Sequence, residues 1–260
     1  VIDGVKGTDP VEQWISGTDG TYTEEDAENG TIPLGFEVGD LRLHQIRYLP
    51  AGEYVLVEEK TPFGFLRAKD ICFTVLDEGK VQGVEMVDEL PEGILEIVKH
   101  DIDHPEQLLA GAVFTLTNKD TGELLQTLTT GDDGKAVSDP VPAGYLDAEG
   151  HYVPYTYVVQ EISAPEDYML NSGTYEFQFT YEDDQTPVIR LTYDAVNKQN
   201  QVRFKKQDDG GNYLAGAKLK VVRKDNGGLV EEWISGGQDH YITGIKAGEY
   251  TPVSYTHLTL

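Results

Sequence analysis

The chain has 260 residues, a formal net charge of −26, a hydrophobic content of 39% and a single cysteine, Cys72. So large an acidic excess disfavours nucleic acids and anionic membranes as partners. One cysteine excludes a disulfide framework, and no run approaches the roughly 20 apolar residues that a membrane-spanning helix needs.

The charge is unevenly distributed along the chain. Residues 1–200 contain 12 Lys and Arg against 39 Asp and Glu, whereas residues 201–260 contain 8 against 7. We interpret the acidic part as a surface that keeps the protein soluble. No signal peptide opens the sequence and no anchor closes it. Because Val1 is not a natural start, we expect an internal fragment of a longer protein.

Turn residues and β-branched or aromatic residues alternate throughout. Tyr, Thr and Val are plentiful, and Gly and Pro recur at intervals of about 8–12 residues, which is typical of all-β sandwiches. A chain of this length also accommodates two or three small domains. The sequence therefore predicts tandem all-β domains.

Internal repetition defines the domains. Residues 11–17 (VEQWISG) reappear as residues 230–236 (VEEWISG), and LAGA occurs at 109–112 and 214–217. The other matches are KDxG at 119–122 and 224–227, AGEY at 51–54 and 247–250, and a looser PAGY at 142–145. We predict three units: 1–91 without its N-terminal strands, a complete unit at 92–199, and the N-terminal part of a third at 200–260.

In the first unit we expect a strand around Trp14, followed by an acidic, Gly-rich excursion over residues 17–40 that forms a long loop or an inserted hairpin. The strand bearing Glu58, a strand at 71–75 and a closing strand at 84–88 complete this unit.

The second unit opens with an alternating strand at 95–101. A hairpin over 111–128 follows, with Asp-Gly and Thr-Gly turn chemistry. We expect residues 145–155 to be a loop insertion. The later strands are expected at 157–161, 175–181, 188–193 and 195–198.

The third unit opens at residue 202 and loses its pattern after Tyr250. A Glu is expected four residues after that tyrosine, but Ser254 stands there. Residues 251–260 carry none of the expected motif, and we interpret them as a non-native tail.

Two stretches share one unusual feature. Residues 54–65 and 157–168 both read Tyr-x-x-x-Glu-x-x-x-Pro and then close on an aromatic residue. In each, one carboxylate, Glu58 or Glu161, lies on the same face of the strand as its apolar neighbours. Such a carboxylate is costly unless it is neutral or paired, so its recurrence indicates a function.

The ordered motifs resemble the Cna-B type (prealbumin-like) repeat of Gram-positive cell-wall-anchored adhesins and pilin shafts. They are the Lys-x-Asp opening strand, the LAGA hairpin, the Tyr-x-x-x-Glu-x-x-x-Pro strand and a final strand ending in Val-Asn or Val-Asp. The resemblance covers residues 5–250. It implies tandem β-sandwich domains with an immunoglobulin-like or prealbumin-like architecture.

The resemblance also implies an intramolecular isopeptide bond between a Lys on the first strand and an Asn or Asp on the last, assisted by a buried Glu. These roles fall on Lys99, Asn197 and Glu161 in the second unit. In the first unit they fall on Glu58 and Asp88, and we expect the matching lysine to lie upstream of Val1.

In the third unit only Lys206 matches, with Lys205 as an adjacent competitor for the same role. The glutamate and the acceptor of this unit have no counterpart in the sequence.

The chemistry is consistent with this assignment. An amine is a nucleophile only when it is neutral, and burial lowers the pKa of a lysine while it raises that of a carboxylic acid. We expect the neutral Glu161 acid to hydrogen-bond the amide oxygen of Asn197 and later to relay a proton to the departing ammonia. Folding supplies the proximity, so the reaction is a single turnover without a cofactor.

The other candidate sites have simpler interpretations. His100 and His104 straddle a Pro-containing turn and lack a ligand pattern, so we expect solvated loop histidines. The acidic doublets, such as Asp132-Asp133, do not fit a calcium loop. Trp14 and Trp233 occupy equivalent repeat positions, which favours packing over a sugar platform. We expect no metal and no enzymatic turnover.

The predicted function is therefore structural: stalk or spacer repeats, monomeric and in series, of a secreted, cell-wall-anchored surface adhesin or pilin. Other parts of the parent protein would contact a host matrix protein or glycan. The alternative is a ligand-binding adhesin module whose contact loops are 17–40 and 145–155. An accessory carbohydrate-binding repeat is a third interpretation.

Overall fold

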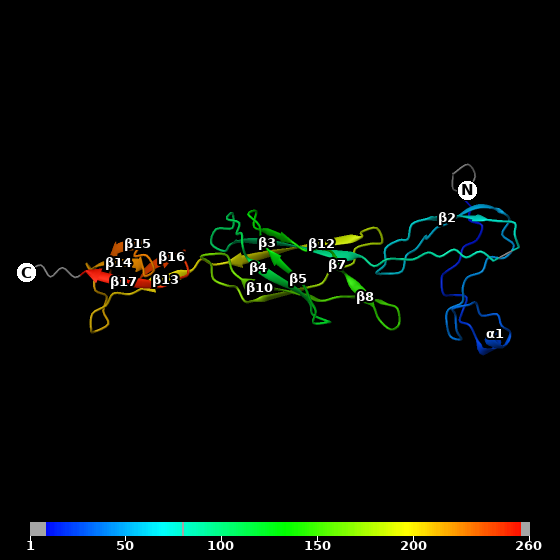
Figure 1. Ribbon diagram of the computed structural model, residues 1–260, viewed down its shortest axis with the longest axis horizontal. Helices are drawn as coiled ribbons and strands as arrows, with labels where there is room; N and C mark the ends of the chain where they lie inside the picture. Colours follow the sequence, from blue (N-terminus) through cyan, green and yellow to red (C-terminus); the bar gives the residue numbers. More distant parts are fainter. Residues whose placement is uncertain (1–8, 80, 256–260) are drawn as a thin grey trace, which may run out of the picture. The chain divides into compact units, whose positions relative to one another are not determined.

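The structure is a computed structural model that describes residues 9–79 and 81–255. The regular elements of its described residues are strands, apart from one short helix, and loops connect them (Figure 1). Contacts divide them into two compact units. One extends to Thr61 and includes Arg67–Glu89; the other comprises Pro62–Leu66 and everything from Leu90 on.

The first of these compact units contains an antiparallel pair of strands, β1 (Gly52–Leu56) and β2 (Ile71–Val75). Residues 17–40 contain the helix α1 (Glu24–Glu28), and an isolated bridge joins Thr21 to Leu41 at their base. The expected excursion is thus a long loop that contains one short helix, and it is not an inserted hairpin.

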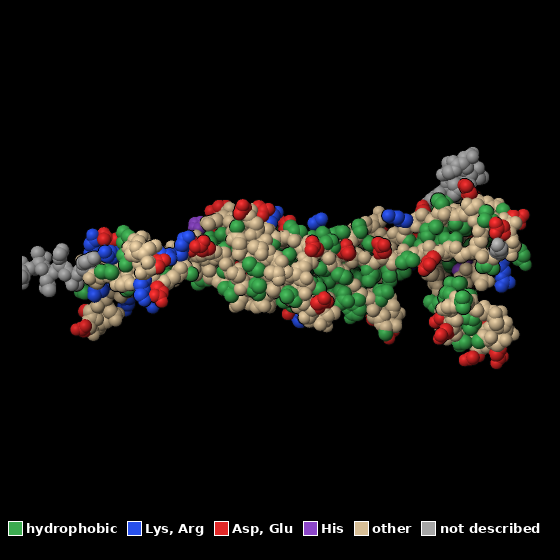
Figure 2. All heavy atoms as spheres, in the orientation of Figure 1, with side chains coloured by type: hydrophobic (Ala, Val, Ile, Leu, Met, Phe, Trp, Pro, Cys, Tyr) green, Lys and Arg blue, Asp and Glu red, His purple; other side chains and the backbone are tan. Residues whose placement is uncertain are grey.

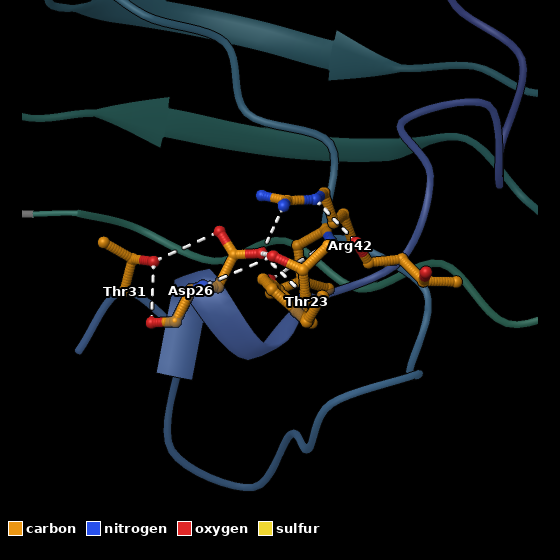
Figure 3. A network of polar contacts seen from close by, with 7 residues as sticks. Thr23, Asp26, Thr31 and Arg42 are labelled. Atoms are coloured by element: carbon orange, nitrogen blue, oxygen red, sulfur yellow. Dashed lines mark hydrogen bonds and ion pairs between the residues drawn. The ribbon is translucent and has the colours of Figure 1, made fainter. Parts of the chain in front are cut away.

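Polar contacts hold α1 in place, since none of its side chains is buried. Thr23 caps the helix: its hydroxyl accepts from the Asp26 N–H at 3.3 Å, and its own N–H donates to the Asp26 carboxylate at 2.7 Å (Figure 3). Arg42 pairs with the same carboxylate. The hydrogen bonds from Thr23, with a smaller contribution from Arg42, lower the pKa of Asp26 to about 2.

The second compact unit contains a β-sandwich built from two four-stranded sheets. One has the order β11-β10-β4-β5; in the other β12, β3 and β6 lie side by side and β7 pairs with β3. The strands are β3 (Glu92–Asp101), β4 (Val113–Asn118), β5 (Leu124–Thr129), β6 (Lys135–Val137), β7 (Val141–Pro142), β10 (Tyr157–Ser163), β11 (Thr174–Phe177) and β12 (Val188–Asn197).

The core of the sandwich lies between these sheets. β3 and β4 alternate buried and half-buried residues along their length, as expected for strands with one face toward a core. Both sheets contribute to one cluster, with Leu95 and Ile97 from β3 and Phe114 and Leu116 from β4. Aromatic rings extend it, with Tyr157 stacked on Phe177 at 5.7 Å.

The first and last strands of the sandwich run parallel. β12 pairs with β3 over all ten residues, from Val188 opposite Glu92 to Asn197 opposite Asp101. β12 is one continuous strand, so the break expected between residues 193 and 195 is absent. The expected insertion at 145–155 is a hairpin of β8 (Gly144–Leu146) and β9 (Tyr152–Pro154).

The remaining strands are β13 (Gln201–Phe204), β14 (Lys218–Arg223), β15 (Leu229–Ile234), β16 (His240–Thr243) and β17 (Tyr250–Tyr255). β13 pairs with β16, and β14 lies between β15 and β17. Val221, Ile242 and Ile245 form a small core. Lys and Arg side chains gather on these strands in Figure 2, in agreement with the balanced charge of this segment.

A tyrosine contact recurs in each predicted repeat. The hydroxyl donates to the carbonyl of the residue just before the Ala-Gly pair of the AGEY or PAGY motif: Tyr54 to Pro50 at 2.9 Å, Tyr250 to Lys246 at 2.5 Å, and Tyr157 to Pro142. Tyr157 lies fifteen residues from its acceptor and the other two lie four. The difference is the β8–β9 insertion, so Tyr54, Tyr157 and Tyr250 are equivalent positions.

Two expected strands of the first predicted repeat are absent. Neither residues 11–17 nor residues 84–88 form a strand. In the sandwich the last strand is held by its parallel first strand. The described residues of the first compact unit contain no such first strand, so the segment at 84–88 lacks its pairing partner.

The tail also differs from expectation. Residues 251–255 continue as β17, which pairs with β14 from Tyr250 opposite Arg223 to Tyr255 opposite Lys218. Alternating β-branched and aromatic residues suit a strand beside β14. That the tail is non-native stays a prediction, and residues 256–260 lie outside the described residues. Among the described residues no helix is long and apolar enough to cross a membrane.

Gly93 of β3 is required by close packing. A Cβ atom at this position would lie 2.2 Å from the ring of Phe179, which is fully buried. We predict that Gly93→Ala destabilises the sandwich by about 1–3 kcal/mol, as overpacking of a core does. Chemical denaturation measures this. Gly237→Ala is the control, because nothing lies within 4 Å of that position; equal losses in the two variants would contradict the packing argument.

Candidate functional site

Lys99 lies on the core side of β3. The alternation of this strand places it with Leu95 and Ile97, and only 1% of its surface is exposed. A lysine is almost never buried without a partner. Its Nζ lies 5.4 Å from the centre of the Phe114 ring and therefore in an apolar environment.

Glu161 of β10 is the partner of Lys99. Its surface is 4% exposed, and its Oε1 atom lies 3.3 Å from Lys99 Nζ. The contact is an ion pair without the alignment of a hydrogen bond, because Oε1 has no hydrogen-bond partner. The other oxygen, Oε2, accepts the backbone N–H of Asn171 at 2.9 Å.

Asn197 at the end of β12 completes the cluster. In the parallel register Ala195 lies opposite Lys99, and Asn197 is two residues further on the same face. Its Nδ2 donates to Glu161 Oε2 at 2.8 Å and to the Met169 carbonyl at 2.7 Å. A carbonyl only accepts, so the nitrogen of the amide must face Met169.

This arrangement corrects one detail expected from the sequence. Glu161 contacts the amide nitrogen of Asn197, and not the amide oxygen. The oxygen, Oδ1, is buried and has no hydrogen-bond partner. The carboxyl group of Glu161 therefore connects the amine of Lys99 on one side with the leaving nitrogen of the amide on the other.

The electrostatics favour a reactive amine. Burial lowers the pKa of Lys99, while the neighbouring Glu161 opposes that shift. Phe114, Val159, Tyr193 and Ala195 line the site with apolar surface. Such surroundings penalise a separated charge pair and favour its conversion to neutral groups by proton transfer.

The first repeat contains a related pair. Glu58 lies just after β1 and Asp88 lies in an extended segment, both half-buried. Burial raises the pKa of Asp88, and the charge of Glu58 and a hydrogen bond to it raise it further. Two adjacent carboxyl groups suit the roles of acceptor and acid, but no lysine amine joins them among the described residues of this repeat.

Glu58 and Glu161 each accept a backbone N–H from an equivalent position of their repeat. The N–H of Ala68 donates to Glu58 Oε2 at 2.9 Å, just as Asn171 donates to Glu161. Each donor lies ten residues after its glutamate. The match supports the equivalence of Glu58 and Glu161 that their motif predicts.

Lys206 is placed differently from Lys99. It follows β13 and is half-buried, whereas the competing Lys205 is exposed, with its Nζ 4.8 Å from the centre of the Tyr213 ring. Ser254 pairs with Leu219 at the position where a glutamate is expected. The structure thus brings Lys99, Glu161 and Asn197 together, and it assembles no such cluster around Lys206 among the residues it describes.

Sequence reasoning missed the backbone groups of the site. The Met169 carbonyl and the Asn171 N–H are available from any residue type, so no side-chain pattern could have identified them. It also gave no role to the buried Asp101, although the Lys-x-Asp motif includes it.

Each of the two tryptophans stacks on a histidine. Trp14 stacks on His44 at 4.3 Å, and Trp233 stacks on His240 at 4.2 Å. His44 and His240 also contact Glu12 and Glu231. Of the two histidines expected in a solvated loop, His104 is exposed, whereas His100 lies in β3 and is half-buried. Within residues 9–79 and 81–255, no group of three His, Cys, Asp or Glu side chains could hold a metal ion.

Comparison with known proteins identifies the sandwich. Residues 93–194 match the family model of the SpaA prealbumin-like fold domain, which confirms the resemblance and the all-β fold class that the motifs predict. No curated protein matches the sequence.

Among solved structures, the chain is similar to the Bacillus anthracis TIE protein, with 23% identity and a TM-score of 0.53. The match covers 80% of this chain and 37% of that one, so the chain spans little more than a third of its length. The shaft pilin SpaA from Lactobacillus rhamnosus GG (a D295N mutant) is 17% identical, over 65% of this chain and 89% of that one, with a TM-score of 0.35. A Streptococcal ancillary pilin is 19% identical, over 80% and 71%, with a TM-score of 0.33. At 23% identity, the likeness to the Bacillus anthracis protein shows the fold alone.

The lowered pKa of Lys99 predicts a pH-dependent stability. In an Asn197→Ala variant, Lys99 remains a free amine that binds its proton less tightly when folded than when unfolded. The unfolded state then binds more protons, so stability rises with pH between the lowered folded pKa and the ordinary value of 10.5.

Thermal unfolding of Asn197→Ala between about pH 7 and about pH 10 tests this. The double variant Lys99→Met/Asn197→Ala is the control, because it lacks the amine. We expect the stability of the single variant to rise relative to the control with increasing pH. A constant difference between the two would contradict the account.

Proposed function

We propose that the chain consists of stalk or spacer repeats of a secreted, cell-wall-anchored surface adhesin or pilin, and that its second repeat closes an autocatalytic isopeptide bond between Lys99 and Asn197. The observation that carries the bond is the burial of an amine, a carboxyl group and an amide in one cluster. The prealbumin-like domain at 93–194 supports the structural role.

The contacts supply a route for each proton. Glu161 Oε1 takes a proton from the Lys99 ammonium, which leaves a neutral amine beside a neutral acid. The amine nitrogen attacks Cγ of Asn197 and the Nζ–Cγ bond forms. Glu161, hydrogen-bonded to Nδ2 through Oε2, gives a proton to that nitrogen as the Cγ–Nδ2 bond breaks, and it takes the second proton of the attacking Nζ as the new amide forms. The products are an amide and one ammonia.

No cofactor is required for this reaction. Folding brings the three groups together, so the proximity that a bimolecular reaction lacks is supplied once for each chain. The bond consumes its own residues, and the protein turns over no substrate.

The mechanical consequence follows from the topology. β3 and β12 are the first and last strands of the sandwich and run parallel, so the bond closes almost the whole repeat into one loop. In the chain-entropy model used for disulfides, a loop of about 100 residues contributes roughly 4–5 kcal/mol. A pull on the two ends passes through the covalent bond, which blocks unfolding of the intervening strands.

We extend the proposal to the first repeat, where Glu58 and Asp88 form the acid and acceptor of a second bond. Its lysine would come from outside the described residues. Release of water instead of ammonia would distinguish this bond from the one at Asn197.

Intact mass of the full chain tests the function. We predict a mass one ammonia below the sequence mass, and the full mass in Glu161→Ala. Glu58→Ala is the matched control, because it makes the same change at the equivalent position of the first repeat and leaves the second site intact. It should keep the loss of ammonia.

Glu161→Gln serves as an isosteric second variant, should truncation to alanine prevent folding. Wild-type protein at its full sequence mass would contradict the proposed bond. A loss of ammonia that persists in both Glu161 variants would contradict the role of Glu161.

A further inference from the structure

Asp101 is a buried carboxylate that the proposed reaction does not use. It lies two residues after Lys99 on the core side of β3, with 1% of its surface exposed. Its Oδ1 accepts the backbone N–H groups of Asp103 and His104 at 2.7 and 3.1 Å. Its Oδ2 accepts the hydroxyl of Tyr168 at 3.0 Å.

Asp101 is ionised in this position. Burial by itself would raise its pKa, but hydrogen bonds from Asp103, Tyr168 and His104 outweigh burial and lower the pKa. A hydrogen bond to an ionised acceptor is stronger than one between neutral groups. The bond from Tyr168 is therefore a firm attachment of its loop to the first strand.

Tyr168 belongs to the loop between β10 and β11, and this loop borders the reacting groups. The next residue, Met169, accepts Asn197 Nδ2 on its carbonyl, and Asn171 donates its N–H to Glu161 Oε2. Backbone contacts hold the other side of the loop, with the Met169 N–H bound to the Lys198 carbonyl at 2.9 Å. Tyr168 is the side chain that connects this loop to the strand bearing Lys99.

The loop fixes the direction of the acceptor amide. Of the two polar atoms of the Asn197 amide, only the nitrogen can donate to the Met169 carbonyl. This contact therefore holds the leaving nitrogen beside Glu161 and disfavours the flipped orientation of the amide. A displaced loop would release the amide to turn its oxygen, which has no partner, toward other donors. Misplacement of a reacting group by about 1 Å can cost a hundredfold in rate.

We propose that Tyr168, anchored on Asp101, is a positioning residue for the cross-linking reaction: it holds the Met169 carbonyl where it orients the departing nitrogen of Asn197. The inference rests on the proposed function, since it concerns the rate at which the Nζ–Cγ bond replaces the Cγ–Nδ2 bond. The proposal gives a role to Asp101 and Tyr168, which lie outside the trio of reacting side chains.

The first repeat offers an internal comparison. Pro62 and Pro165 follow their glutamates at the same spacing, and the position of Tyr168 is taken there by Phe65, which has no hydroxyl. The acceptor in that repeat is Asp88, whose carboxyl group has no amide nitrogen to orient. The hydroxyl is thus present where the acceptor is an amide and absent where it is a carboxyl group.

Time-resolved mass spectrometry tests the proposal. The full chain is made by cell-free translation, synthesis is stopped, samples are quenched in acid at intervals, and the fraction that has lost ammonia is measured. We expect Tyr168→Phe to form the bond roughly tenfold more slowly than wild type or worse. The expected end point is the same covalent product.

Tyr157→Phe is the matched control. It removes a hydroxyl from the first residue of β10, the strand that precedes the loop, where the acceptor is the Pro142 carbonyl, and it should leave the rate unchanged. Both changes are also made in a Lys99→Met background, which cannot form the bond, and their melting temperatures are compared. A purely structural role for Tyr168 would slow cross-linking only in proportion to lost stability.

The outcomes separate the two proposals. The positioning role is supported if only Tyr168→Phe slows cross-linking while Tyr168→Phe and Tyr157→Phe lower the melting temperature by similar amounts in the Lys99→Met background. Equal rates in wild type and Tyr168→Phe, or equal slowing in Tyr157→Phe, overturn it and leave the proposed function intact. Wild-type chain that never loses ammonia overturns the proposed function, and the positioning role with it.

Discussion

The contact between Lys99 and Glu161 is the constraint on which the second repeat depends. An amine and a carboxyl group lie 3.3 Å apart in the core, with 1% and 4% of their surfaces exposed. Removing two charges from water costs several kcal/mol per ion, and the pair recovers this only with excellent geometry. Here Glu161 Oε1 has no aligned partner, so the pair is poorly satisfied as ions. Conversion to a neutral amide with Asn197 removes the charged amine altogether.

The topology of the sandwich determines which strands the proposed bond would tie together. The parallel pairing of β3 and β12 places Lys99 and Asn197 on the same face of neighbouring strands, two residues apart in register. Tyr157, Phe177 and Phe179 pack against one another in the core that both sheets share. A covalent bond at this position would join the ends of the repeat, so the stability of the repeat under load would not depend on strand hydrogen bonds alone.

The sequence predicted the side-chain part of this account and not the backbone part. Turn spacing, alternation and repeated motifs located the strands of the sandwich, because those features follow from local geometry. Burial of Lys99 and Glu161 also followed from their place in alternating strands. The hydrogen bond from the Asn197 nitrogen, the Met169 carbonyl and the helix α1 depended on tertiary contacts or on backbone groups, which leave no residue pattern. The segment at 84–88 was mispredicted because a strand needs a partner as well as a pattern.

Peptide sequencing of the digested wild-type chain by tandem mass spectrometry tests the central claim most directly. The account predicts a branched peptide in which the side chain of Lys99 is joined to that of Asn197, with fragment ions from both segments and one ammonia lost at the junction. Separate linear peptides, with an unmodified lysine at 99 and an unmodified asparagine at 197, would contradict it.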